Sequence, residues 1–229
     1  PWSLPSNLCL CAGADIDYVL VSDPDVDLPY YLAAARMDYY GKKKELKVLK
    51  ALKGSDLLGN KYEPLLPYFG ELEKEGCFQV LNDGYVTTES GTGIVHIAPG
   101  FGEDDFRVMS EAGIKSIVCP VNNLGKFTSE VDDLVDVYVK DADKEIIKRL
   151  KSEGKFLEQS SYNHSYPFCY RTDTPLIYKA VPSWYVKVEQ IRDKMVKNNQ
   201  QVNWVPNHLK DGRFGNWLAG ARDWSISRT

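Results

Sequence analysis

Residues 91–105 read Gly-Thr-Gly-Ile-Val-His-Ile-Ala-Pro-Gly-Phe-Gly-Glu-Asp-Asp and carry the densest signal in the sequence. A short apolar strand over 92–98 presents His96, and a Pro-Gly-x-Gly loop then reverses the chain. Asp104 and Asp105 open a helix, where the helix dipole favours acidic side chains. A carboxylate at this position that also faced a cleft would suit the ammonium group of a substrate. Taken alone, the segment is more typical of a turn between strand and helix than of a binding site.

The same stretch does not fit a nucleotide-binding loop. Gly91-x-Gly93-x-x-His96 lacks the third glycine of the dinucleotide motif, and no Gly-Lys-Ser/Thr follows it. The five cysteines are irregularly spaced without a Cys-x-x-Cys pair, and the three histidines are scattered. These spacings indicate neither a metal site nor a disulfide framework, and they are typical of reduced thiols in a cytosolic protein.

Strand and helix signals alternate irregularly on either side of this stretch. Strands are predicted at 18–21, 78–81 and 85–87, and the last two form a hairpin around Asp83-Gly84. Residues 54–70 are predicted to be mostly loop, whereas 46–52 fits a strand and a helix equally well. Helices are predicted over 27–40 (with Pro29 in the first turn and Gly41 after the end), 103–112, 143–153 and 189–198. This mixture favours an α+β fold on an antiparallel or barrel-like sheet, with a soft boundary near residue 180.

Composition and charge limit the classes of protein. Of the 229 residues, 43% are apolar and 12% aromatic, which supports a sizeable core and excludes a disordered chain. The apolar runs are too short to span a membrane. The net charge of −4 lacks the basic surplus of a dedicated duplex-binding protein. One lysine run is more typical of a solvated face than of a phosphate-tracking stripe; its members are Lys42, Lys43, Lys44, Lys47, Lys50 and Lys53.

Three further segments stand out by composition. Residues 1–7 read Pro-Trp-Ser-Leu-Pro-Ser-Asn and predict an extended terminus stiffened by proline. Residues 164–175 read His-Ser-Tyr-Pro-Phe-Cys-Tyr-Arg-Thr-Asp-Thr-Pro, an aromatic density that is typical of a core. Residues 212–228 combine tryptophan, arginine and glycine in a density that fits cation–π packing or nucleotide contact.

In this order, the four segments closely resemble the editing domain of isoleucyl-tRNA synthetases, the insertion that interrupts their catalytic Rossmann fold. Residues 1–7 resemble the end of the family's threonine-rich peptide, and 91–105 resemble its Gly-Thr-Gly-x-Val-His…Asp-Asp signature. Residues 164–175 match its His-Ser-Tyr-Pro stretch, and 203–228 resemble the return to the synthetase core. Phe101 stands where bacterial members often have His, which suggests a cytosolic enzyme of eukaryotic or archaeal type.

The resemblance implies a fold and an activity. The fold would be α+β, with an antiparallel, barrel-like β core and peripheral helices. Residues 1–180 would form the editing domain, and 181–229 would form the connection to the catalytic core. The domain would hydrolyse valine wrongly esterified to tRNA(Ile), because one methylene gives too little discrimination in a single binding step. The attacking water would be positioned with help from the ribose hydroxyl of the terminal adenosine, so that proximity supplies much of the rate.

The resemblance also gives individual residues roles in this reaction. Asp105 and His96 would be the catalytic pair: Asp105 would hold the α-ammonium group, and His96 would line the pocket near the ester. Trp2 and Tyr166 would contact the valine side chain. The remaining substrate-binding residues would be Ser3, Asn7 and Gly93.

The resemblance implies partners as well. These are the 3′ end of tRNA(Ile) carrying valine and the rest of a monomeric synthetase in the cytoplasm, with no membrane. We expect no metal and no cofactor for hydrolysis, since ATP would serve only the parent synthetase. The family's threonines lie directly before Pro-Trp and would help to position the water. The chain starts at Pro1, as a fragment would, so we expect its hydrolytic activity alone to be incomplete.

Two other interpretations remain open from the sequence. The first is a non-catalytic module that docks the tRNA acceptor end or packs against the synthetase. The lysine run and the segment Trp204–Trp224 fit this module as well as they fit the hydrolase. The second is the related editing domain of a valyl-tRNA synthetase, which is nearer than that of a leucyl-tRNA synthetase.

Overall fold

The computed structural model describes residues 1–43, 45–161 and 165–227, and it divides the chain into two compact units. The first unit is Pro1–Ala180 and the second is Val181–Thr229. The division falls where the composition of the sequence changes. The roles expected for the two parts, an editing domain and a connection to a catalytic core, stay predictions.

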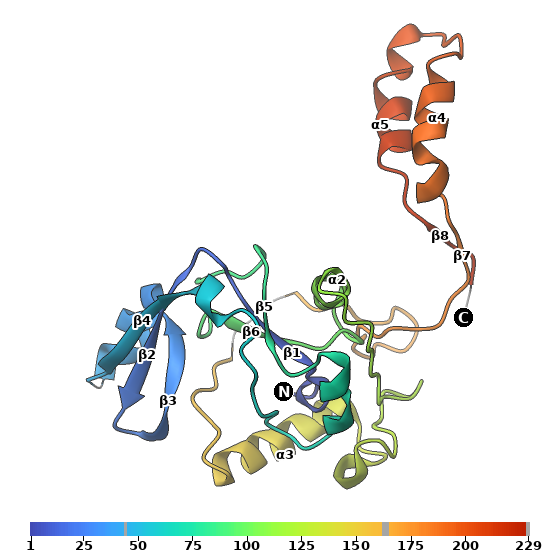
Figure 1. The fold of residues 1–229 in the computed structure, drawn as a ribbon. Coiled ribbons are helices and arrows are strands. Elements are labelled where there is room, and N and C mark those ends of the chain that lie inside the picture. Colours follow the sequence, from blue (N-terminus) through green and yellow to red (C-terminus); the bar gives the residue numbers. More distant parts are fainter. Residues whose placement is uncertain (44, 162–164, 228–229) are drawn as a thin grey trace. The chain divides into compact units, whose positions relative to one another are not determined.

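A three-stranded sheet holds the stretch that carries His96. The strands are β1 (Cys9–Ala12), β5 (Val80–Asn82) and β6 (Ile94–Ile97), in the order β5-β1-β6 (Figure 1). β1 runs antiparallel to β6 and parallel to β5. Buried residues of β1 and β6 pack against Val108 and Met109 of helix α2 (Glu103–Glu111), so this helix and β6 share one core. The strand over 92–98 and the helix over 103–112 are thus confirmed, each within a few residues.

A second sheet is antiparallel throughout and has the order β3-β2-β4. It consists of β2 (Asp17–Asp23), β3 (Val26–Ala33) and β4 (Lys47–Lys53), which lie side by side in Figure 1. The segment 46–52, whose sequence fits a strand and a helix equally well, thus forms a strand. Between β2 and β4 the register shifts: Leu20 pairs with Lys50, and Val21 pairs with Val48. Leu49 is therefore an extra residue, as in a β-bulge.

The helix predicted over 27–40 is wrong for most of its length. Val26–Ala33 is strand β3, and only Met37–Tyr40 forms an α-helix, α1. Pro29 lies within this edge strand, where a missing N–H is tolerated, and does not open a helix. The apolar residues fit both periods, and pairing with β2 buries Leu32 and Ala33 completely. Burial of these side chains in the sheet therefore favours the strand over the helix.

The predicted hairpin around Asp83-Gly84 is also wrong. β5 ends at Asn82 and pairs with β1, and residues 85–87 form no strand. The barrel-like core is not confirmed, because the strands within the described ranges form three separate sheets and no closed barrel. Several β-rich segments make only isolated bridges, such as Val121 with Phe127 and Lys126 with Tyr138. A mixed α and β architecture with mainly antiparallel pairing is confirmed.

Short helices complete the first unit. Helix α3 (Val139–Ser152) begins four residues before the predicted start at Asp143, and it buries Val139, Ala142, Ile146 and Leu150 against Phe127 and Leu134. The 3-10 helices of this unit are η1 (Leu4–Ser6), η2 (Ala34–Arg36), η3 (Gly41–Lys43), η4 (Gly54–Leu57), η5 (Gly70–Glu75) and η6 (Asp132–Leu134). Apart from η4 and the start of η5, residues 54–70 form no helix or strand beyond an isolated bridge at Lys61, in line with the predicted loop.

The second unit consists of two α-helices and two 3-10 helices on a two-stranded ribbon. The helices are η7 (Glu189–Ile191), α4 (Arg192–Asn199), η8 (Asn207–Leu209) and α5 (Arg213–Ala219), and the strands are β7 (Tyr185–Val186) and β8 (Trp224–Ser225). The ring of Trp204 packs against Phe214, with 4.6 Å between the ring centroids, and Trp204 donates its indole N–H to Asn199 Oδ1. Phe214 also lies 5.6 Å from Trp217 between ring centroids, so Trp204 and Trp217 have a shared packing partner within this unit.

Candidate functional site

His96 lies on β6 and is held by the amino-terminal segment. Its Nε2 atom is 3.0 Å from Ser3 Oγ, so that residues 93 positions apart in the sequence meet in a hydrogen bond. Within the described part of the chain, His96 Nδ1 is buried and makes no hydrogen bond. Burial lowers the pKa of His96 to about 4, because the imidazolium form loses its hydration. At neutral pH the ring is uncharged, with Nε2 held by Ser3 and Nδ1 buried without a partner among the described residues.

Asp105 lies in the first turn of α2 and reaches back to the end of β6. Its Oδ2 atom accepts the backbone N–H of Ala98 at 2.9 Å, two residues beyond His96. Burial raises the pKa of Asp105, with a smaller contribution from Asp104, and the bond from Ala98 opposes this rise. Gly102 leaves room for the carboxylate, since a Cβ there would lie 2.8 Å from Asp105 Oδ2. Oδ1 makes no hydrogen bond to any described residue, so one oxygen is free to meet a cation.

Trp2 and Tyr166 are brought together by a residue that the sequence did not single out. The Lys140 Nζ atom lies 5.7 Å from the ring centroid of Trp2 and 4.8 Å from that of Tyr166, within cation–π range of both. Trp2 also packs edge-on against Phe101, with ring centroids 4.9 Å apart. Its backbone N–H donates to Asp143 Oδ1 at 2.7 Å. Because α3 begins at Val139, before the predicted start, Lys140 had no sequence signal that linked it to the site.

Asn7 and Gly93 have structural contacts of their own. Asn7 donates to the carbonyl of Cys9 and accepts the hydroxyl of Tyr62, so its side chain fixes the turn into β1. Gly93 has φ of +82°, and a Cβ there would lie 2.6 Å from the Cβ of Ala33. Its carbonyl accepts the hydroxyl of Tyr18 at 2.6 Å. These contacts explain both residue types through the fold, and a role for either residue in substrate binding stays a prediction.

The described structure thus gathers Trp2, Ser3 and His96 near the start of the chain, and it joins Asp105 to the strand that carries His96. Tyr166 meets Trp2 through Lys140, and its hydroxyl donates to the carbonyl of Leu176. His164, which opens the third sequence segment, lies outside the described residues. In this arrangement a neutral imidazole and a partly buried carboxylate flank one strand end, which suits a cationic substrate with a polar ester.

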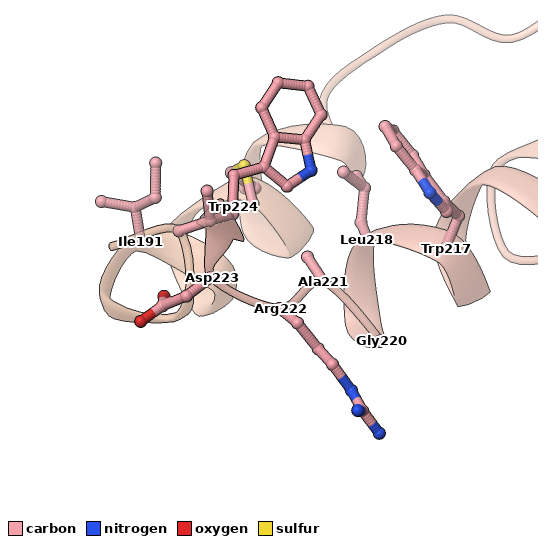
Figure 2. A pocket seen from close by; sticks show the side chains of 10 residues that line it. Ile191, Trp217, Leu218, Gly220, Ala221, Arg222, Asp223 and Trp224 are labelled. Carbon is pink, nitrogen blue, oxygen red and sulfur yellow. The ribbon is translucent and has the colours of Figure 1, made fainter. Parts of the chain in front are cut away.

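A separate cavity lies in the second unit. Figure 2 shows it lined by Trp217, Leu218 and Trp224, with Arg222 and Asp223 at its border, and its volume is about 370 Å³. None of the predicted site residues lines it. Among the described residues, no group of three or more His, Cys, Asp or Glu side chains could hold a metal ion. In the same residues, no helix has the length and apolar character needed to cross a membrane.

Comparison with known proteins finds relatives of this chain among isoleucine–tRNA ligases. It is 52% identical over 230 residues to the isoleucine–tRNA ligase of Bdellovibrio bacteriovorus and 50% identical over 244 residues to that of Treponema denticola. It is 49% identical over 233 residues to the cytoplasmic isoleucine–tRNA ligase of Caenorhabditis elegans. These alignments cover 100% of this chain but only 22%, 22% and 20% of the relatives, so the chain spans about a fifth of their length. Bacterial and eukaryotic relatives match almost equally well, so the identities do not reproduce the distinction expected from Phe101.

The fold has a counterpart among solved structures. The crystal structure of GlLeuRS-CP1 superimposes with a TM-score of 0.55 at 15% sequence identity, covering 71% of this chain and 81% of that chain. At this identity the likeness concerns the fold alone. Residues 19–229 match the family described as tRNA synthetases class I (I, L, M and V). The match spans both compact units, and with the relatives above it shows that the chain belongs to the class I tRNA synthetases of this group.

Proposed function

We propose that this chain is the editing part of an isoleucyl-tRNA synthetase and hydrolyses the ester of valine mischarged on tRNA(Ile). The observation that carries the proposal is the presence of two half-buried groups on β6 and directly beyond its end: a neutral His96 held by Ser3, and Asp105, which is bonded to Ala98 and has one oxygen free among the described residues. The resemblance of the four sequence segments to the editing domain, the isoleucine–tRNA ligase relatives and the fold of the CP1 segment support it.

Asp105 would bind the α-ammonium group of the esterified amino acid through Oδ1. The Ala98 N–H fixes the carboxylate through Oδ2, so little side-chain entropy would be lost when the ammonium group binds. An opposite charge favours the ionised carboxylate, so the bound substrate would offset the rise in pKa that burial causes. A charge-assisted hydrogen bond of this kind contributes roughly 1.5–3 kcal/mol.

His96 would act through Nδ1. When the Ser3 hydroxyl donates to Nε2, Nδ1 carries the proton and can donate to the ester carbonyl. In the other tautomer, Nε2 donates to Ser3 and Nδ1 can accept a hydrogen bond from the attacking water. In either case the ring positions a group by hydrogen bonding and carries no positive charge at neutral pH. The rest of the synthetase and the valine-bearing 3′ end of tRNA(Ile) are the partners in this proposal, in the cytoplasm and without a cofactor for hydrolysis.

Replacement of Asp105 by Asn in the full-length synthetase tests the proposal. Asn keeps the size of the side chain and an oxygen for the Ala98 N–H, but it loses the charge. We expect hydrolysis of Val-tRNA(Ile) to fall about 10- to 100-fold, in line with the loss of one charge-assisted bond. Asp104→Asn is the matched control, since the neighbouring Asp104 is exposed and pairs with Arg107.

The assay compares the deacylation rates of Val-tRNA(Ile) and Ile-tRNA(Ile), and circular dichroism checks that the fold is intact. Normal valine clearance by Asp105→Asn would exclude the proposed site. If tRNA affinity changed while hydrolysis did not, the non-catalytic docking module would explain the chain better.

A further inference from the structure

The lysine run has an arrangement in the structure that its sequence pattern does not reveal. Residues 36–53 carry seven basic and two acidic side chains, a net charge of +5 within a chain whose net charge is −4. β4 forms the last part of this segment and is an edge strand, with Lys47 to Ala51 exposed. Three of the seven basic side chains, those of Lys47, Lys50 and Lys53, lie on this edge strand.

The bulge at Leu49 brings two of these lysines onto the same face. In a regular strand, residues three apart point to opposite faces. Here Lys50 lies opposite Leu20 and Lys47 lies opposite Ser22, and residues 20 and 22 of β2 share a face. Because Leu49 has no partner on β2, only one paired position, that of Val48, separates Lys47 from Lys50. Both lysine side chains therefore point to the same face of the sheet. Tyr31 of β3 lies opposite Leu20 and joins the same face.

This face, made of Ser22, Tyr31, Lys47 and Lys50 around Leu20, is the basic face. The other side of the sheet is covered, since Val19, Val21 and Leu32 pack against Met37, Tyr40 and Leu46. Among the described residues, Lys47 and Lys50 form no ion pair, and the hydroxyl groups of Ser22 and Tyr31 make no hydrogen bond. Lys53 differs, because it pairs with Asp17 at 2.8 Å and is therefore left out. The basic face thus presents two ammonium groups and two hydroxyl groups, all of which can donate to phosphate oxygens.

The basic face continues toward the candidate site. Tyr18, Ala33 and Leu52 lie further along the same side of the sheet, where they pack with Ile94 of β6. Tyr18 donates to the carbonyl of Gly93, and Ala33 donates its N–H to the carbonyl of Thr92, in the two residues that precede β6. From Lys47 to Leu52 the strand advances by four paired positions, from Ser22 to Tyr18 of β2, and so covers roughly 14 Å. A ligand on the basic face would therefore lie beyond the reach of a single aminoacyl nucleotide at His96.

We propose that the basic face binds the phosphate backbone of the tRNA whose 3′ end enters the site at His96 and Asp105. The inference rests on the proposed function, and it assigns the surface for the body of the same substrate. Charge complementarity favours a polyanion, and the hydroxyl groups beside the lysines suit phosphate oxygens. The contact carries no sequence information, so it would position the tRNA without selecting it.

Salt-dependent binding tests the proposal. The dissociation constant of the chain for a tRNA(Ile) transcript is measured by fluorescence anisotropy at several KCl concentrations, for the wild type and for Lys47→Gln/Lys50→Gln. Two lost phosphate contacts reduce the slope of log K against log[KCl] by about 2, and they weaken binding about 10- to 30-fold at physiological salt. The control is Lys144→Gln/Lys148→Gln, which removes the same charge from exposed positions of α3.

An unchanged slope in Lys47→Gln/Lys50→Gln, or an equal loss in the α3 control, would overturn the proposal. Polyglutamate serves as a second probe, and binding to it as tight as to tRNA would assign the face to acidic proteins instead. Hydrolysis of valyl-adenosine ester by the full synthetase separates the two proposals. If the ester is hydrolysed and the lysine variant binds tRNA normally, only the basic face is wrong. If tRNA binds through the lysines but valine is never cleared, only the hydrolase is wrong.

Discussion

The ring of His96 is fixed through only one of its two nitrogens. Ser3 holds one ring nitrogen, while the other is buried without a partner among the described residues. A buried nitrogen without a hydrogen bond costs free energy, and such costs persist where a ligand supplies the missing partner. In the proposed function, an atom of the substrate would supply the hydrogen bond that Nδ1 lacks.

The titration of His96 gives a direct check. Because burial lowers its pKa to about 4, the unfolded chain binds a proton between about pH 6.5 and 4 that the folded chain does not. The free energy of unfolding should therefore fall as the pH drops through this window, by at most about 3 kcal/mol. NMR titration measures the pKa, with His96→Gln used to assign the signal. A midpoint near 6.5 would show that the ring is solvated.

Individual residues also show where sequence reasoning ends. Asp105 was placed correctly at the start of a helix, because acidic residues after a glycine-rich loop carry a local signal. Lys140 was missed, since its contacts with Trp2 and Tyr166 depend on three segments that are distant in the sequence. Ser3 and His96 were both named, but their bond could not be foreseen from residues 93 positions apart.

Among the helices and strands, the largest difference from the sequence prediction is strand β3, which lies where a helix is predicted. The segment 27–40 offers apolar residues at both helical and strand spacing, and only its pairing with β2 separates the two. The predicted hairpin around Asp83-Gly84 is wrong for a related reason. An Asp-Gly turn is a local signal, whereas the parallel pairing of β5 with β1 joins segments about 70 residues apart. Local patterns identified β6, α2 and most of α3, whose spacing fits one period only.

The junction between the two sheets of the first unit depends on Gly93. Its left-handed backbone and its closeness to Ala33 leave no room for a side chain, and its carbonyl is tied to Tyr18. We expect Gly93→Ala to lower the free energy of unfolding by about 2–4 kcal/mol, through backbone strain and overpacking together. Urea unfolding measures the loss. Gly84→Ala is the control, since a Cβ at Gly84 would meet nothing within 4 Å; similar effects in both variants would exclude this explanation.

The whole molecule consists of two units with unequal cores. The first holds nearly all the buried apolar side chains, whereas Leu218 is the one buried hydrophobic residue in the described part of the second. Small units bury a smaller fraction of their surface and are correspondingly less stable. The second unit also exposes several large side chains, including Trp184, Trp217 and Trp224.

We therefore expect the second unit to unfold at a lower urea concentration than the first. Four of the five tryptophans lie in the second unit, at positions 184, 204, 217 and 224, so tryptophan fluorescence reports mainly on it. Its midpoint should precede the main transition in far-UV circular dichroism. Trp2→Phe removes the tryptophan of the first unit and should leave the early transition in place. Coincident curves for both probes would mean that the chain unfolds as one unit.

The bulge at Leu49 has a consequence for the evolution of the basic face. Substitutions at Lys47 or Lys50 change how many charges the face carries, but the count of residues between them decides which side of the sheet receives each charge. A deletion of Leu49 would leave the two lysines two residues apart, so a regular strand would keep both on the basic face, whereas regular pairing with Leu49 still present would turn Lys47 to the covered side. Among relatives, two lysines separated by one residue without a bulge should therefore present the same face as Lys47 and Lys50, which are separated by two residues of which one is the bulge.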